Sequence, residues 1–305
     1  MPKGQIDVRT ALRKSLGATR PPEKITQEAY AQNSAHLRRL ARLQSGERPE
    51  GSDLFDYMED LRYTEIQSSL LIYLLPICLE VWRNDLRGFD SSYGGVVEHF
   101  YPVLADRHVF DVHLKKKQSE TVSQFMRHTI LDEIDDQRGL SYEGATARPY
   151  RWFSELTTYG VLVPDMDRLW TAWWSLSTMG RAVAAIQYIS CLMYPENENR
   201  IFAPWTRDGG GGPPCLWEFA GHLYAHRWLE ANVAFLRSSL GVHNISDVLT
   251  IAVSRLADEP EHSVAARIQE DFPLCEATVR TRCGALPRFL ETKQEAGRDF
   301  EWPAS

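Results

Sequence analysis

A row of histidine and glutamate side chains at four-residue intervals is the part of this chain best suited to chemistry. Glu218, His222 and His226 follow one another at this spacing, and Glu230 continues it. Steps of four residues keep side chains on one face of a helix, so these carboxylates and imidazoles would lie together. Imidazole nitrogens and carboxylate oxygens are common ligands of divalent metal ions. The spacing therefore suggests a metal site formed by Glu218, His222 and His226.

A buried hydrogen-bond network explains the same residues without a metal. Apolar residues flank the row on several sides, so its helix is expected to be buried on more than one face. Buried carboxylates and imidazoles are tolerated when they are paired with one another. The row also lacks the glutamate that follows the first histidine of HExxH metalloproteases. We therefore expect no cofactor, and the alternative is one divalent metal ion such as zinc, manganese or iron.

Two positions elsewhere in the chain could complete a site near this row. Asp132 lies four residues after His128 in MRHTILDEIDDQ and could supply a metal ligand from a second helix, although a solvated acidic face is the favoured interpretation of these residues. Trp205 lies in the loop FAPWTRDGGGGPP, where an aromatic side chain beside glycines is placed like a binding residue. The glycine run itself lacks the spacing of a phosphate-binding loop.

Apolar residues recur at helical spacing along most of the chain, and no alternating strand pattern competes with them. The sequence therefore predicts an all-α fold. Seven of the nine tryptophans lie between residues 152 and 228, which indicates the heart of the core. We expect Asp165–Tyr194 to be a mostly buried central helix. Further helices are predicted at about Gln27–Leu43, Val96–Leu104, Lys117–Gln137 and Leu216–Leu240.

Charge and turn residues divide the chain into three parts. Residues 1–52 are predicted to be a basic, partly disordered arm that adds little to the core, since residues 1–53 hold ten Lys and Arg against six Asp and Glu. Residues 53–240 form the main helical domain. Residues 241–305 form a small helical C-terminal module.

This C-terminal module contains three short helical patterns, at Ile245–Ala257, Ser263–Phe272 and Leu274–Leu290. The stretch SVAARIQEDFPLCEATVRTRCGAL resembles a helix-turn-helix, with a turn near Phe272 and Pro273. The resemblance implies that Thr278, Arg280 and Arg282 face DNA, where arginines meet phosphates or guanine edges. The module is acidic overall, which opposes phosphate binding, so a small packing or partner-binding module is the other interpretation.

The cysteines and the apolar runs of the sequence indicate the cellular compartment of the protein. The five cysteines are widely spaced and form no CxxC pair, which fits a reducing cytoplasm better than a disulfide framework. The apolar run Leu70–Leu79 is too short to cross a bilayer, and Arg181 would interrupt the longer run at 169–194. We expect a cytoplasmic protein without membrane contact.

No complete catalytic motif is present, and the net charge of −7 is unevenly distributed along the chain. These features favour a non-catalytic protein-binding or regulatory protein, such as an immunity, antitoxin or adaptor component. One alternative is a metal-dependent, hydrolase-like enzyme that uses the Glu218, His222 and His226 row with a metal-bound water. The second alternative is a DNA-binding regulator that uses the C-terminal module, although nucleic acid is the less favoured partner.

Overall fold

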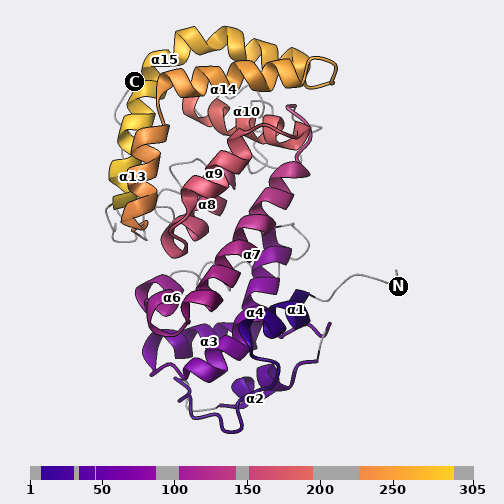
Figure 1. The fold of residues 1–305 in the computed structure, drawn as a ribbon, viewed down its shortest axis with the longest axis vertical. Helices are drawn as coiled ribbons and strands as arrows, with labels where there is room; N and C mark the ends of the chain where they lie inside the picture. Colours follow the sequence, from indigo (N-terminus) through magenta and orange to yellow (C-terminus); the bar gives the residue numbers. More distant parts are fainter. Residues whose placement is uncertain are drawn as a thin grey trace, which may run out of the picture. The chain divides into compact units, whose positions relative to one another are not determined.

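The structure is a computed structural model that describes residues 8–30, 34–44, 46–86, 103–141, 151–194 and 227–291. Within these ranges the chain forms helices and no strand, so the all-α class is confirmed (Figure 1). The chain divides into two compact units, Met1–Thr129 and Ile130–Ser305, and each is described by itself. The division falls within one helix, and the boundaries that the sequence suggests at residues 52 and 240 stay a prediction.

The N-terminal unit is built on its most apolar helix, α4. Its helices are α1 (Val8–Leu16), α2 (Ala35–Arg42), α3 (Gly51–Tyr63), α4 (Ser68–Leu86), α6 (Val109–Val112) and the start of α7 (Lys116–Asp135). The run Leu70–Leu79 lies in α4, and every residue in it except Ile72 is buried. α1 packs against α4, and α2 packs against α3. This run is therefore a core helix, and none of the helices described is long and apolar enough to span a membrane.

The described part of residues 1–52 belongs to this core. α1 and α2 bury apolar side chains at helical spacing: Leu12, Leu16, Leu37, Leu40 and Ala41. Arg9 is also buried. Its guanidinium group donates to Glu80 Oε2 at 2.7 Å and to the carbonyl oxygens of Gln44 and Glu47 at 2.9 and 2.8 Å. The expectation that this segment adds little to the core is wrong, because each short helix has an apolar stripe that packs inward.

The C-terminal unit is centred on α10 (Met179–Met193), in which every residue from Ala182 to Met193 is buried. α9 (Met166–Trp174), α14 (Val242–Arg255) and α15 (His262–Glu291) pack against it. Among the residues described, this unit also contains α8 (Arg151–Leu162), α13 (Glu230–Ser239) and the end of α7. The expected buried central helix is thus present, and it begins at Met179.

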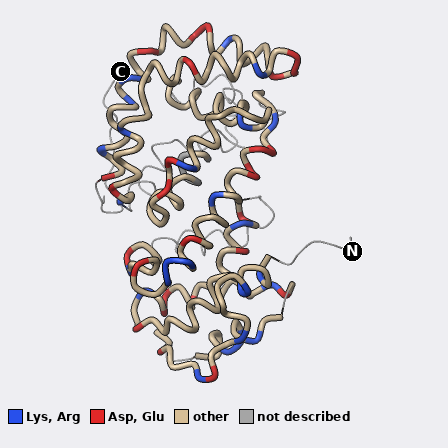
Figure 2. The backbone as a smooth tube through the Cα atoms, in the orientation of Figure 1, with Lys and Arg blue, Asp and Glu red and all other residues tan. Residues whose placement is uncertain are grey.

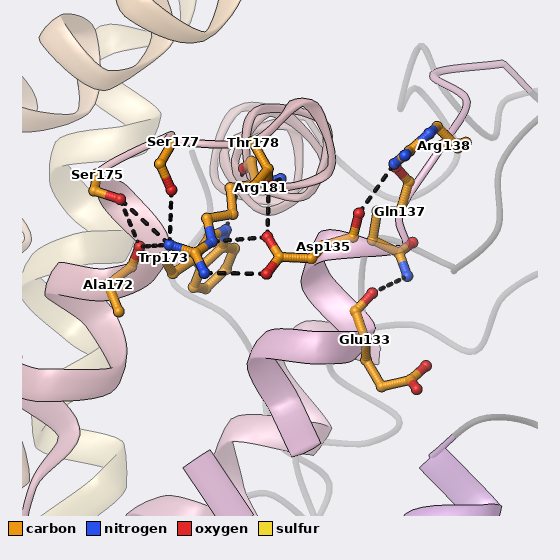
Figure 3. Close-up of polar contacts among 10 residues, drawn as sticks. All are labelled: Glu133, Asp135, Gln137, Arg138, Ala172, Trp173, Ser175, Ser177, Thr178 and Arg181. Carbon is orange, nitrogen blue, oxygen red and sulfur yellow. Dashed lines mark hydrogen bonds and ion pairs between the residues drawn. The ribbon is translucent and has the colours of Figure 1, made fainter. Parts of the chain in front are cut away.

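The segment Asp165–Tyr194 forms two helices and a corner, whereas the sequence suggested one continuous helix. Leu176 has a positive φ of 50°, which ends α9, and the Thr178 hydroxyl caps the next helix by accepting from the Arg181 amide. Arg181 holds the corner together (Figure 3). Its Nε and Nη2 donate to the Asp135 carboxylate at 2.8 and 3.0 Å, and its Nη1 donates to Ala172 O at 2.7 Å.

Four aromatic rings form the centre of this unit beside α10. Trp170 lies 5.4 Å from Trp173, 4.8 Å from Trp174 and 5.4 Å from Tyr188, measured between ring centroids. Edge-to-face and tilted ring pairs at such distances add to the stabilisation from burial. Trp170 and Trp173 are buried core residues, as the concentration of tryptophan in the sequence indicates, and Trp174 is half-buried beside them.

The C-terminal part differs from its expected helix-turn-helix pattern. Ser263–Phe272 and Leu274–Leu290 are one continuous helix, α15, which passes through Pro273 without a turn. α15 packs against α13, α14 and α10, so its buried face is already covered. The turn that the resemblance requires is therefore absent from the described residues.

A pair of glycine substitutions tests this packing. A Cβ added to Gly160 would lie 2.3 Å from Trp228 Cδ2, and Trp228 is buried. Gly160→Ala is expected to lower the free energy of unfolding by about 2 kcal/mol, because the ring must move within a packed core. Gly284→Ala is the control, since its added Cβ meets nothing within 4 Å, and it should raise stability by about 0.5–1 kcal/mol through helix propensity. Urea unfolding measures both changes, and equal effects at the two sites would contradict the packing argument.

Candidate functional site

Most of the metal site suggested by the sequence lies outside the described residues. Glu218, His222, His226 and Trp205 all fall there, so the metal hypothesis stays a prediction. Glu230 is the first residue of α13, and residues 227–229 just before it are not helical. The predicted helix Leu216–Leu240 is therefore not continuous into α13. Asp132 and His128 lie exposed on α7, and no group of three or more metal-binding side chains occurs among the residues with described positions.

The two arginines of the expected DNA-reading helix lie on different faces of α15. Arg282 Nη1 donates to Cys191 O at 2.9 Å and to Tyr194 O at 2.8 Å. These carbonyls belong to the end of α10, where a cation satisfies unpaired oxygens and the negative end of the helix dipole. Arg280 is exposed and pairs with Glu276 at 2.6 Å. Arg282 thus already has a structural contact within the unit.

The corner between α3 and α4 holds a segment that is distant in the sequence and has no helix or strand, Lys24–Tyr30, which we call the strap. Gln67 binds the strap backbone at three points: its Oε1 accepts from the amides of Thr26 and Gln27 at 2.8 and 3.2 Å, and its Nε2 donates to Lys24 O at 2.8 Å. Gln27 returns this contact, because its Oε1 accepts from the Gln67 amide at 2.8 Å. Its Nε2 also donates to Thr64 Oγ1 at 2.6 Å.

These contacts explain why the predicted helix Gln27–Leu43 is wrong at its N-terminal end. Residues 27–30 are not helical, and the helix of this region, α2, begins at Ala35. The strap amides are satisfied by side chains of the α3–α4 corner and so do not need helical partners. Sequence spacing could not reveal this, since the contacts join residues about 40 positions apart.

The strap ends at a buried carboxylate. Asp60 Oδ1 accepts from the Tyr30 amide at 2.7 Å, and Asp60 Oδ2 lies 2.6 Å from His36 Nε2. Because an ionised carboxylate only accepts hydrogen bonds, His36 Nε2 carries the proton in this contact. The side chains of Asp60 and His36 are 1% and 2% exposed. One carboxylate therefore joins the end of the strap to α2 and α3.

An exposed pair of stacked tyrosines lies next to this carboxylate in the sequence. Tyr63 follows Asp60 by three residues, and Tyr30 is the last residue of the strap. The rings of Tyr30 and Tyr63 stack with centroids 4.6 Å apart, and the Arg62 guanidinium lies 5.3 Å from the centre of the Tyr63 ring. Tyr30 is 57% exposed and Tyr63 is 52% exposed. Phe55, seven residues before Arg62, is also exposed and lies on the same face of α3. We call Tyr30, Phe55, Arg62 and Tyr63 the aromatic surface.

Cations accompany the aromatic surface on the neighbouring helix α2. Arg38, Arg39 and Arg42 lie on α2 and are all exposed. Figure 2 marks basic residues in blue in the part of the chain that Figure 1 labels α2. Arg39 donates to the Asp53 carboxylate at 2.5 Å, which together with nearby acidic groups raises the pKa of Arg39. In the described part of the chain no ion pair involves Arg38, Arg42 or Arg62. Three cations are thus available to an acidic partner.

The interior beneath this surface is unsuited to nucleophilic chemistry. Burial raises the pKa of Cys78 to about 12 and raises the pKa of Tyr57 well above its ordinary value. A thiol in this state stays protonated at neutral pH and is a poor nucleophile. The pKa of His113 is lowered by partial burial and by the Arg107 cation, and its Nδ1 lies 2.9 Å from Ser68 Oγ. These groups support the fold.

The sequence contained a weak signal for the aromatic surface that pattern reading missed. Arg62 and Tyr63 are adjacent at the end of a helix, but Tyr30 reaches them only through the strap contacts. Searches for metal-binding or nucleophilic spacing do not find such a surface. Compared with known proteins, the chain matches no family model, no curated protein and no solved structure.

Proposed function

We propose that this protein is a non-catalytic protein-binding protein that docks an acidic partner on the aromatic surface of its N-terminal unit. The observation that carries the proposal is the exposed Tyr30–Tyr63 stack with the Arg62 guanidinium 5.3 Å from the centre of the Tyr63 ring. Large aromatic side chains are normally buried, so an exposed, ordered stack is an uncommon use of apolar surface.

Physical properties of this surface suit a protein interface. Tyrosine and arginine are enriched among residues that dominate binding energy, because they bury a large area and keep polar atoms for hydrogen bonds. The stack fixes both rings before a partner arrives, which lowers the conformational entropy lost on binding. Arg62 supplies positive charge on the surface itself, and Arg38 and Arg42 are exposed cations on α2, the helix that packs against α3. The complementary partner presents carboxylates opposite these cations and an apolar centre opposite the rings.

Other observations support this choice over the two alternatives. A DNA-binding role for the C-terminal part needs Arg282, whose guanidinium already binds two carbonyls of the same unit. A metal-dependent enzyme rests on Glu218, His222 and His226, which remain a sequence hypothesis. We place the protein and its partner in the cytoplasm, a proposal supported by the wide spacing of the five cysteines, which form no CxxC pair.

The test compares two substitutions on the aromatic surface with one outside it. Tyr63→Ala removes one ring of the stack, and Arg62→Glu reverses the charge above it. Each is expected to weaken partner binding by about 2 kcal/mol or more, which is roughly 30-fold in Kd. Val112→Ala is the control, because Val112 is 67% exposed in the same unit but belongs to α6.

The measurement has two stages. Proteins captured by both the wild-type chain and the Val112→Ala control are identified and purified, whether or not they also bind the aromatic-surface variants. Their affinities for all four proteins are then measured by calorimetry at two salt concentrations. A partner that binds Tyr63→Ala and the wild type equally would contradict the proposal, as would binding by Arg62→Glu that is unchanged at low salt.

A further inference from the structure

The strap makes few apolar contacts of its own. Among its seven residues, all of which are described, Gln27 is the buried one, and Ile25 and Ala29 are half-buried. The strap is held mainly by hydrogen bonds to Asp60, Thr64 and Gln67. Segments held by exposed hydrogen bonds with little apolar burial open at a lower free energy than the core around them.

Chain segments on both sides of the strap have their own attachments. α1 is fixed by Arg9 through Glu80 and by buried leucines, and α2 is fixed by the Arg39–Asp53 pair and by Leu37 and Leu40. Residues 17–23, before the strap, contain no helix and begin with Gly17 at φ 71°. The strap can therefore leave the corner without dislodging α1 or α2.

Docking of the strap also places one half of the aromatic surface. The Tyr30 amide is held by Asp60, and the Tyr30 ring then stacks on Tyr63, which belongs to α3. Tyr63, Arg62 and Phe55 stay on α3 whether or not the strap is docked. Only Tyr30 arrives with the strap.

We propose that the strap Lys24–Tyr30 opens and closes as one unit over the α3–α4 corner, and that this motion assembles and dismantles the tyrosine pair. The closed strap presents the complete aromatic surface, and the open strap leaves Tyr63 without its stacking partner. A partner that needs both rings binds only the closed form, so its binding shifts the strap toward closure. This regulatory role rests on the proposed function, whereas the opening itself does not.

Trypsin cleavage after Lys24 reports the open strap, because Gln67 holds the Lys24 carbonyl in the closed form. Gln67→Ala removes three hydrogen bonds to the strap backbone and should raise the cleavage rate at Lys24 by about tenfold or more. Ser69→Ala is the matched control, since its hydroxyl lies 3.1 Å from Gln67 Nε2 but does not touch the strap. Mass spectrometry measures cleavage of the peptide bond after Lys24 in each variant.

Two further measurements report the tyrosine pair and the fold. Tyrosyl-radical crosslinking should join Tyr30 to Tyr63 in the wild type and in Ser69→Ala, and the yield should fall several-fold in Gln67→Ala. Hydrogen exchange should speed up at the amides of Thr26, Gln27 and Tyr30 and stay unchanged within α3 and α4. Should Gln67→Ala fail to fold, Gln27→Ala removes bonds from the strap side and leaves the corner residues intact.

Two outcomes overturn the proposal. Equal cleavage at Lys24 in Gln67→Ala and Ser69→Ala would show that the side-chain bonds do not hold the strap. Faster exchange in α3 and α4 together with the strap would show that the strap is part of the core and does not open alone. Both measurements use the protein without a partner. Failure of the proposed function would instead be seen as normal partner binding by Tyr63→Ala, so the two failures are distinguishable.

Discussion

Asp135→Ala is expected to lower the free energy of unfolding of the C-terminal unit by about 3 kcal/mol. The Asp135 carboxylate accepts from Arg181 Nε and Nη2 and from the Thr178 hydroxyl at 2.6 Å (Figure 3). The Arg181 side chain is 16% exposed, so it would keep a largely buried cation without its carboxylate. Bidentate arginine–carboxylate pairs are stronger than single hydrogen bonds, which makes the loss larger than that of one bond.

Asp136→Ala provides the matched control, because Asp136 is the next residue and its side chain is exposed. It should change stability by less than about 0.5 kcal/mol. Urea unfolding followed by tryptophan fluorescence is a suitable measurement, since Trp173 Nε1 donates to Arg181 O at 3.3 Å. Equal stability of the two variants would show that the α9–α10 corner does not depend on the Asp135–Arg181 pair.

This corner also shows what sequence reading can and cannot predict. The apolar run after Met179 predicts a buried helix, and the helical period of α7 predicts its position within two residues. The break at Leu176 has no glycine or proline to mark it, because it is stabilised by Arg181 and by Asp135, which lies 46 residues before Arg181. Periodicity reports which face is buried, but it carries no information on such distant polar partners.

At Pro273 the sequence suggested a helix break that the structure does not have, the opposite of the unmarked break at Leu176. A proline with a preceding phenylalanine suggests a turn, yet α15 continues through it. The packing of α15 against α10 and α14 stabilises one continuous helix on both sides of Pro273. Tertiary contacts here outweigh a local helix-breaking signal, as they do at the strap, where side-chain hydrogen bonds replace an expected helix.

The aromatic surface depends on topology more than on motif. Arg62 and Tyr63 could be selected from the sequence as an exposed helix end, but nothing marks Tyr30 as their neighbour. The pairing of Tyr30 with Tyr63 follows from Asp60. Asp60 lies one helical turn before Tyr63 on α3, and its carboxylate accepts from the Tyr30 amide. Residues that are ordinary one by one thus become a site when a buried carboxylate fixes their positions.

Replacing Asp60 with alanine is expected to have the largest effect, a loss of about 4 kcal/mol from the stability of the N-terminal unit. Asp60 is the shared acceptor of His36 Nε2 and of the Tyr30 amide, and it is almost fully buried. Removing the carboxylate leaves the His36 Nε2–H group and the Tyr30 amide without an acceptor. Each unsatisfied donor costs about 1–3 kcal/mol of stability. Thermal unfolding followed by circular dichroism measures the change.

A double substitution separates the cost of the stranded histidine from the loss of packing. His36→Leu in the Asp60→Ala background removes the imidazole that has lost its acceptor, so the double variant should be more stable than Asp60→Ala alone by about 1–2 kcal/mol. Asp56→Ala is the control on the same helix, since Asp56 is half-buried and should cost less than about 1 kcal/mol. If the double variant is less stable than Asp60→Ala, the His36–Asp60 contact is not what stabilises this junction.

Because Asp60 also holds Tyr30, crosslinking of Tyr30 to Tyr63 should be lost in both Asp60 variants and kept in Asp56→Ala. This result would link the stability of the buried His36–Asp60 pair to the assembly of the aromatic surface.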